Sequence, residues 1–368
     1  MTVVAPDGRL LALLTADLPG VELTAPRAPM TPQDWSMFAP QVHAHRQNAR
    51  LLQLAAEDRW PLTDAQRDQL AGVARDVAAS CLELDRELVR TVRRLRGFDV
   101  RVLKGAAYAH VVHPNPLLRS YVDVDLLLPS HEFERARELI VSMGTRRAYA
   151  EPRPGFDRRF GKGGTFVNPR GYAIDLHRTL TTGVFGLALD EEDLFTDGTS
   201  FTIGGEPLAA LSVENMFLHA CLTVGLEDGI RLDHLRDLAE LTHLTSGSLD
   251  RIVERAHRWR IEVVVARAVT RVVQDLHLDP AHPWHLWAAA YRSSRRDRRW
   301  LAPYVGTTAS YAGQTLVALE AIPGFRPRVS YTWAMVAPAA GSGRADLGQR
   351  VRTIRRSLRA WRPGATAR

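Results

Sequence analysis

Two aspartates one residue apart, Asp123 and Asp125, are the clearest groups for chemistry in this chain. They lie in residues 121–128 (YVDVDLLL), where alternating polar and apolar residues predict a β-strand. Alternate side chains of a strand share one face, which places the two carboxylates roughly 6–7 Å apart. Close carboxylates repel each other, and a divalent cation such as Mg²⁺ relieves that repulsion. The pair therefore indicates a metal site, and the alternative is two ordinary acids on a solvent-facing strand edge. The apolar neighbours are expected on the opposite, buried face: Val122, Val124 and Leu126.

A third acid follows in a second predicted strand, residues 173–177, where Asp175 and His177 alternate with apolar residues. A carboxylate on a neighbouring strand would complete a two-metal site for in-line phosphoryl transfer. His177 would orient a ligand or act as a base; a surface histidine at a strand end is the alternative.

Lys104 and Gly105 stand where a short β-like run turns into a predicted helix. Helix N-termini bind phosphate through free N–H groups, and glycine lets the backbone approach closely. Arg119, four residues before Asp123, is placed to reach a triphosphate by charge-assisted bonding. Among 48 lysines and arginines, only Lys104 and Lys162 are lysine. Either a compact ammonium is required at these two places, or the two lysines are codon noise.

The elements that carry these residues change along the chain. Residues 1–98 are predicted to form a helical segment, with helix starts at Thr31 and Thr63. Residues 99–210 alternate short strands and helices, and residues 211–368 return to helical periods. The expected fold class is α+β: a small mixed-sheet core between N- and C-terminal helical segments.

Several other patterns have simpler explanations. Residues 161–164 (GKGG) lack the spacing of a phosphate-binding loop and are predicted to be a flexible loop, from which Lys162 could swing over a nucleotide. A capped, partly exposed helix face explains His219, Asp233, His234 and Asp237 about as well as a metal does. The basic run 292–299 is predicted to be a solvated face. The Arg-rich stretch 350–362 is expected to pack on preceding helices, with weak binding to an anionic surface or nucleic acid as the alternative.

Residues 102–144 (VLKGAAYAHVVHPNPLLRSYVDVDLLLPSHEFERARELIVSMG) resemble the uncharacterised nucleotidyltransferase family, a branch of the DNA-polymerase-beta-like nucleotidyltransferase superfamily. Similar features are a Lys-Gly pair, a proline-containing loop, an arginine, the Asp-x-Asp strand and an acidic-Leu-His strand. The resemblance extends over residues 31–245 through further pairs: Trp35, His45-Arg46, Leu218-His219 and the run 231–238. The chain departs from the wider superfamily by having Lys104-Gly105 instead of Gly-Ser, and Tyr121 where a small polar residue is frequent.

The resemblance implies a nucleotidyltransferase that uses two Mg²⁺ ions and an NTP, with ATP as the first candidate, to transfer NMP to an acceptor hydroxyl and release pyrophosphate. Asp123, Asp125 and Asp175 would be the catalytic, metal-binding acids. Lys104, the Gly105 amide, Arg119 and His177 would form the nucleotide side of the site. The acceptor stays open among a small metabolite, a peptide or protein side chain, and an RNA end.

Composition limits the remaining choices. The chain has 368 residues, 45% hydrophobic and 24% charged, which is typical of a globular protein. Two cysteines, no secretory leader pattern and no long apolar run favour a cytoplasmic protein without a membrane span. A net charge of +7 favours anionic partners. A non-catalytic nucleotide- or RNA-binding protein is the main alternative, and a kinase is disfavoured because its glycine-rich loop and catalytic motifs are missing.

Overall fold

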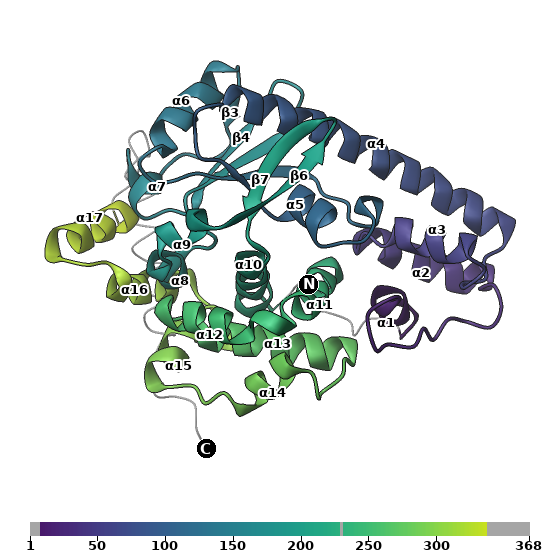
Figure 1. Cartoon of the computed structure of the whole chain (residues 1–368). Helices are drawn as coiled ribbons and strands as arrows, with labels where there is room; N and C mark the ends of the chain where they lie inside the picture. Colours follow the sequence, from purple (N-terminus) through teal and green to yellow (C-terminus); the bar gives the residue numbers. More distant parts are fainter. Residues whose placement is uncertain (1–7, 229–230, 337–368) are drawn as a thin grey trace.

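The computed structural model describes residues 8–228 and 231–336 (Figure 1). The Arg-rich stretch 350–362 lies outside the described residues. The chain folds as expected into a mixed sheet between N- and C-terminal helical segments, which confirms the α+β class. None of the helices within the described ranges has the length and apolar character needed to cross a membrane.

The sheet has seven strands in the order β3-β4-β5-β2-β1-β7-β6. The pairs β2–β5 and β1–β7 are parallel, and the other pairs are antiparallel. The hairpin β6–β7 was not predicted, although both strands alternate in burial. The strands are β1 (Arg101–Val102), β2 (Asp123–Leu127), β3 (Arg146–Arg147), β4 (Gly163–Val167), β5 (Ala173–His177), β6 (Gly198–Ile203) and β7 (Glu206–Leu211).

Short helices connect these strands, and α5 contacts both β2 and β6. Val122 was expected on a buried face, but it precedes β2 and is 59% exposed, whereas Val124 and Leu126 are buried. The connecting helices are α5 (Lys104–Val111), η1 (Pro116–Leu118), α6 (Phe133–Ser142), α7 (Phe156–Arg159), α8 (Gly183–Ala188) and α9 (Glu191–Thr196).

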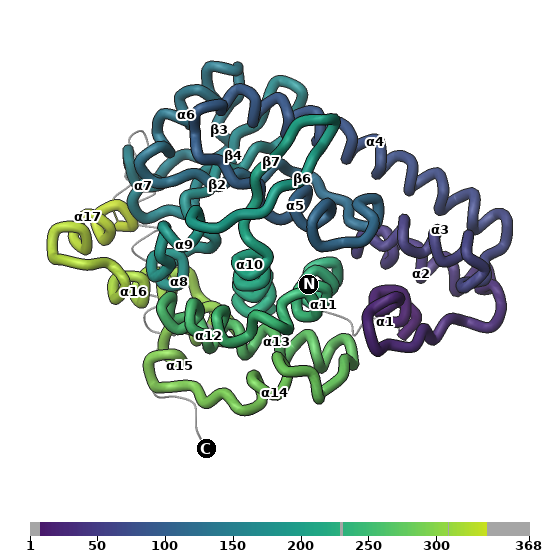
Figure 2. Tube along the Cα trace, viewed as in Figure 1, coloured from purple at the N-terminus to yellow at the C-terminus, as the bar shows by residue number. Residues whose placement is uncertain are grey.

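The N-terminal helices begin where their capping residues predict. Thr31 caps α2 with Pro32 in its first turn, and Thr63 and Gln66 form a capping box on α4. The tube in Figure 2 shows α4 as the long helix running along one side of the molecule. Helix α1 at the start of this segment buries three leucines against the core. The N-terminal helices are α1 (Gly8–Thr15), α2 (Pro32–Ala44), α3 (Asn48–Ala56) and α4 (Asp64–Arg94).

Most C-terminal helices gather below the sheet in Figure 1, with α10 and α11 the most deeply buried. One buried apolar cluster extends continuously from Leu10 to Val317 and includes all three segments. In α15 most arginines are exposed, as expected for a solvated face. The helices are α10 (Val213–Leu226), α11 (Leu232–Leu244), η2 (Ser246–Ser248), α12 (Leu249–Arg258), α13 (Glu262–Leu276), α14 (Pro283–Ala290), α15 (Arg295–Leu301), η3 (Gly306–Thr308), α16 (Tyr311–Ala321) and α17 (Phe325–Val336).

Candidate active site

The parallel pairing of β2 and β5 brings the predicted acids together. Asp125 is directly opposite Asp175 in the register, and Leu127 is opposite His177. Ligand atoms of Asp125, Asp175 and His177 all lie within 4.8 Å of one another. Asp123 precedes Asp125 by two residues on the same strand, and both line a cavity of about 280 Å³. Residues 52 positions apart along the chain therefore form one cluster.

Asp125 is the most buried of the three acids, with two cationic or hydrogen-bonding neighbours. His177 Nε2 donates to its Oδ1 at 2.6 Å, and the Lys104 ammonium lies 3.4 Å from the same oxygen. Burial alone would raise the pKa of Asp125, but the charge of Lys104 and the His177 hydrogen bond outweigh it and leave the pKa well below its usual range. Asp125 is therefore an ionised carboxylate at neutral pH, the form that binds a cation.

His177 is buried, so the alternative of a surface histidine is wrong. Burial lowers its pKa to about 4, assisted by the nearby charge of Lys162. The imidazole is therefore neutral at pH 7. Its Nε2–H donates to Asp125 and fixes the orientation of this carboxylate, as hydrogen bonds to metal-binding side chains commonly do.

The surroundings of the other two acids also favour a cation. Burial and repulsion from Asp125 raise the pKa of Asp123. Asp175 Oδ1 is buried without a hydrogen-bond partner among the described residues. A buried carboxylate oxygen without a donor is costly unless a cation completes its surroundings. Together with the hard oxygen donors of the other two acids, this orphaned oxygen makes the cluster a fitting site for Mg²⁺.

Lys104 and Gly105 open α5 beside these acids, as the sequence predicts. The backbone of Lys104 has φ +37°, in the left-handed region, and this sharp turn directs the chain into the helix. A Cβ at Gly105 would lie 2.9 Å from Tyr121 Cβ, so glycine is needed for the close packing under the cavity. Both residues line the same cavity as Asp123 and Asp125.

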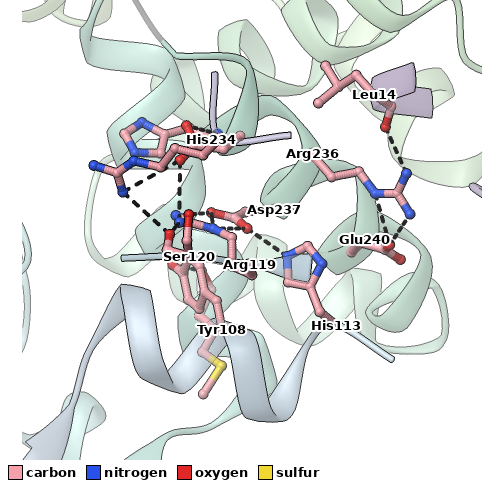
Figure 3. A network of polar contacts seen from close by, with 12 residues as sticks. Leu14, Tyr108, His113, Arg119, Ser120, His234, Arg236, Asp237 and Glu240 are labelled. Carbon is pink, nitrogen blue, oxygen red and sulfur yellow. Dashed lines mark hydrogen bonds and ion pairs between the residues drawn. The ribbon is translucent and has the colours of Figure 1, made fainter. Parts of the chain in front are cut away.

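Arg119 lines this cavity too, but its guanidinium is engaged within the protein. It contacts Asp237 at 2.8–3.0 Å through Nε and Nη2, and Asp233 at 3.3 Å through Nη1. Figure 3 shows Arg119 and His113 converging on Asp237. Arg119 therefore has two carboxylate partners within the protein, whereas its position in the sequence predicted contact with a triphosphate.

Of the four helix positions for which a partly exposed face was the alternative to a metal, three are buried and His234 is partly buried. Asp233 and Asp237 on α11 are 1% exposed because they hold Arg119, and His219 on α10 is also 1% exposed. Both ring nitrogens of His219 lack partners among the described residues. Interhelical packing, which a single helix pattern does not reveal, explains the difference.

Two arginines in the cavity wall were not singled out for binding. Arg46 has φ +59° and donates to the Ser120 carbonyl at 3.4 Å, and Arg231 pairs with Asp233 at 3.0 Å. Both lie in segments on which the family resemblance depends, His45-Arg46 and the run 231–238. The sequence therefore pointed to these arginines, but not to their place in the cavity wall. They add positive charge to the wall of the cavity that the acids line.

Lys162 is also placed differently from the expectation of a flexible loop. It directly precedes β4, and its carbonyl accepts hydrogen bonds from the N–H groups of Arg178 and Thr179 at 2.7 and 3.4 Å. Burial and repulsion from Lys104 lower the pKa of Lys162 to about 8. The two lysines of the chain therefore lie together beside Asp125.

A sequence model of the uncharacterised nucleotidyltransferase family matches residues 31–276. A solved structure of an antigenic nucleotidyltransferase-like protein from Paracoccidioides brasiliensis is similar at 14% identity and a TM-score of 0.32, covering 56% of this chain and 98% of that one. No curated protein matches the chain. With two thirds of its length matched by the family model, the chain belongs to the uncharacterised nucleotidyltransferase family.

Proposed function

We propose that the protein is a Mg²⁺-dependent nucleotidyltransferase that transfers NMP, with AMP as the first candidate, from an NTP to an acceptor hydroxyl. The observation that supports this most directly is the meeting of three carboxylates from β2 and β5 with Lys104 at the start of α5. Acids alone would suit a cation, and a basic helix start alone would suit a phosphate. Their contact at 3.4 Å suits a metal-bound triphosphate.

In this proposal each group has one task. Lys104 and the Gly105 amide hold the triphosphate, and Asp123, Asp125 and Asp175 hold the metal ions. Bound there, Mg²⁺ would neutralise charge on the phosphate oxygens. His177 keeps Asp125 oriented through its 2.6 Å hydrogen bond.

The reaction is a displacement at the α-phosphorus. The acceptor oxygen forms a bond to this phosphorus while the bond to the bridging oxygen of pyrophosphate breaks. The acceptor proton passes to the Asp175 carboxylate, whose Oδ1 has no competing donor among the described residues. Arg119 supports the wall of the cavity through Asp237 and Asp233.

A transfer assay tests the proposal. The purified chain is incubated with MgCl₂, a metabolite, peptide or RNA extract and ATP labelled at the α-phosphorus. We expect pyrophosphate release together with label on an acceptor, and loss of both in Asp125→Asn. The exposed, matched variant Asp68→Asn on α4 is the control and should react as the parent does.

The alternatives give different products. A kinase releases ADP from ATP, and a non-catalytic nucleotide- or RNA-binding protein releases neither ADP nor pyrophosphate. Parallel reactions with GTP, CTP and UTP identify the nucleotide. Pyrophosphate release that persists in Asp125→Asn would contradict the assigned role of the acids.

A further inference from the structure

A second cavity of about 290 Å³ adjoins the acidic cluster from the other side. It is lined by Asp175 and His177 of β5 and by the start of β4, whereas Asp123, Asp125 and Lys104 line the first cavity. Among the described residues Lys162 alone lines both cavities. Lys162 therefore stands at their junction.

The backbone around Lys162 is built to hold this position. Gly163, the first residue of β4, has φ +155°, and a Cβ there would lie 1.8 Å from the Leu176 carbonyl oxygen. Glycine thus permits β4 to begin directly against the end of β5. The two hydrogen bonds to the Lys162 carbonyl then fix the residue beside His177.

The charge of Lys162 has no ion-pair partner in the part of the chain that the structure describes. Lys104 pairs with Asp125 at 3.4 Å, but Lys162 has no carboxylate within 4 Å among the described residues. Its electrostatic neighbours are Lys104, Asp125 and Asp175. A half-buried cation without an ion pair beside a second cation is stabilised by an added anion. The chain has only these two lysines, and the fold brings both to the same carboxylate.

We propose that Lys162 is a catalytic residue that binds the α-phosphate, the group transferred, while Lys104 binds the β- and γ-phosphates. This inference rests on the proposed nucleotidyl transfer. The transferred phosphorus has to lie where nucleotide and acceptor meet, and Lys162 occupies the junction of the two cavities. The nucleotide then occupies the first cavity, and the acceptor hydroxyl approaches Asp175 from the second.

Equilibrium binding of the two halves of the nucleotide tests this assignment without an acceptor or turnover. AMP carries only the α-phosphate, and pyrophosphate carries only the leaving group. Isothermal titration calorimetry with each probe, in MgCl₂, compares the parent with Lys162→Met and Lys104→Met. Methionine keeps an unbranched apolar stem and removes the charge, and circular dichroism and thermal melting check that each variant folds. Lys162→Gln serves as a second variant should Lys162→Met be unfolded.

We expect Lys162→Met to weaken AMP binding about 10- to 100-fold, as loss of a charge-assisted hydrogen bond predicts, and to change pyrophosphate binding less than about twofold. Lys104→Met should show the reverse order. AMP binding by a folded Lys162 variant equal to that of the parent, or equal weakening of both probes, would overturn the assignment of Lys162 alone. A parent chain that binds neither probe and releases no pyrophosphate would instead overturn the proposed function together with this inference.

Discussion

Replacing Asp237 by asparagine should destabilise the protein strongly, although the residue lies outside the acidic cluster. Asp237 is 1% exposed and forms three contacts with Arg119 at 2.8–3.0 Å and one with His113 at 2.8 Å. Burial by itself would raise the pKa of Asp237, but the Arg119 charge and the His113 hydrogen bond outweigh it, so the pKa lies well below its ordinary value. The ion pair thus fixes α11 against the segment that leads into β2.

The magnitude follows from the charge left behind. Asparagine has the same shape, but it is neutral and turns an N–H₂ donor toward groups that are themselves donors. Arg119 would keep only Asp233, at 3.3 Å, as a carboxylate partner. Breaking a buried ion pair in this way costs about 3–5 kcal/mol. The double variant Arg119→Met/Asp237→Asn should recover part of that loss, because the uncompensated charge is removed.

Urea unfolding followed by tryptophan fluorescence measures these free energies. The control is Glu254→Gln, which removes an exposed pair with Arg258 at 3.9 Å and should cost less than about 0.5 kcal/mol. The folded-state pKa of Asp237 is depressed, so its stabilisation is present above the unfolded pKa of about 3.9 and is lost as the pH falls. The difference between parent and Asp237→Asn should therefore be constant from pH 5 to 8 and narrow below about pH 4. A loss no larger than that of the control would refute the reasoning and leave Arg119 available for phosphate.

Three further outcomes are expected. In metal-free thermal melts, Asp123→Asn should raise the melting temperature, because burial and repulsion disfavour the charge of Asp123. Asp125→Asn should lower it, because Lys104 loses its ion pair. The opposite order would contradict the assigned electrostatics. Gly163→Ala should lower the melting temperature and abolish pyrophosphate release, because its Cβ would collide with a backbone carbonyl. The control Gly247→Ala, whose Cβ would meet no atom within 4 Å, should change little. An active Gly163→Ala would show that β4 can shift. MgCl₂ should stabilise the parent and not Asp175→Asn, and equal stabilisation of both would place the ion elsewhere.

The sequence by itself determined the local order of the site. The strand–lysine–glycine–helix order, the Asp-x-Asp strand and the acidic-Leu-His strand all depend on neighbours within a few residues, where strand alternation and helix caps act. The α+β class and the membership of the nucleotidyltransferase family follow from the same local patterns. The hairpin β6–β7 was not predicted from such patterns. Its strands are stabilised by packing and by the pairing of β7 with β1, which residues far away in the sequence provide.

Only the tertiary structure decided which groups meet and which charges remain free. The register that puts Asp125 opposite Asp175 joins strands separated by about 50 residues, and the pair Arg119–Asp237 joins residues 118 positions apart. No local spacing encodes these contacts, because they arise when separate apolar faces are buried together. For the same reason a lysine that the sequence places in a glycine-rich loop is held in the structure at the junction of two cavities, beside the only other lysine of the chain. Packing of β4 against β5, which burial of the sheet enforces, decided that position.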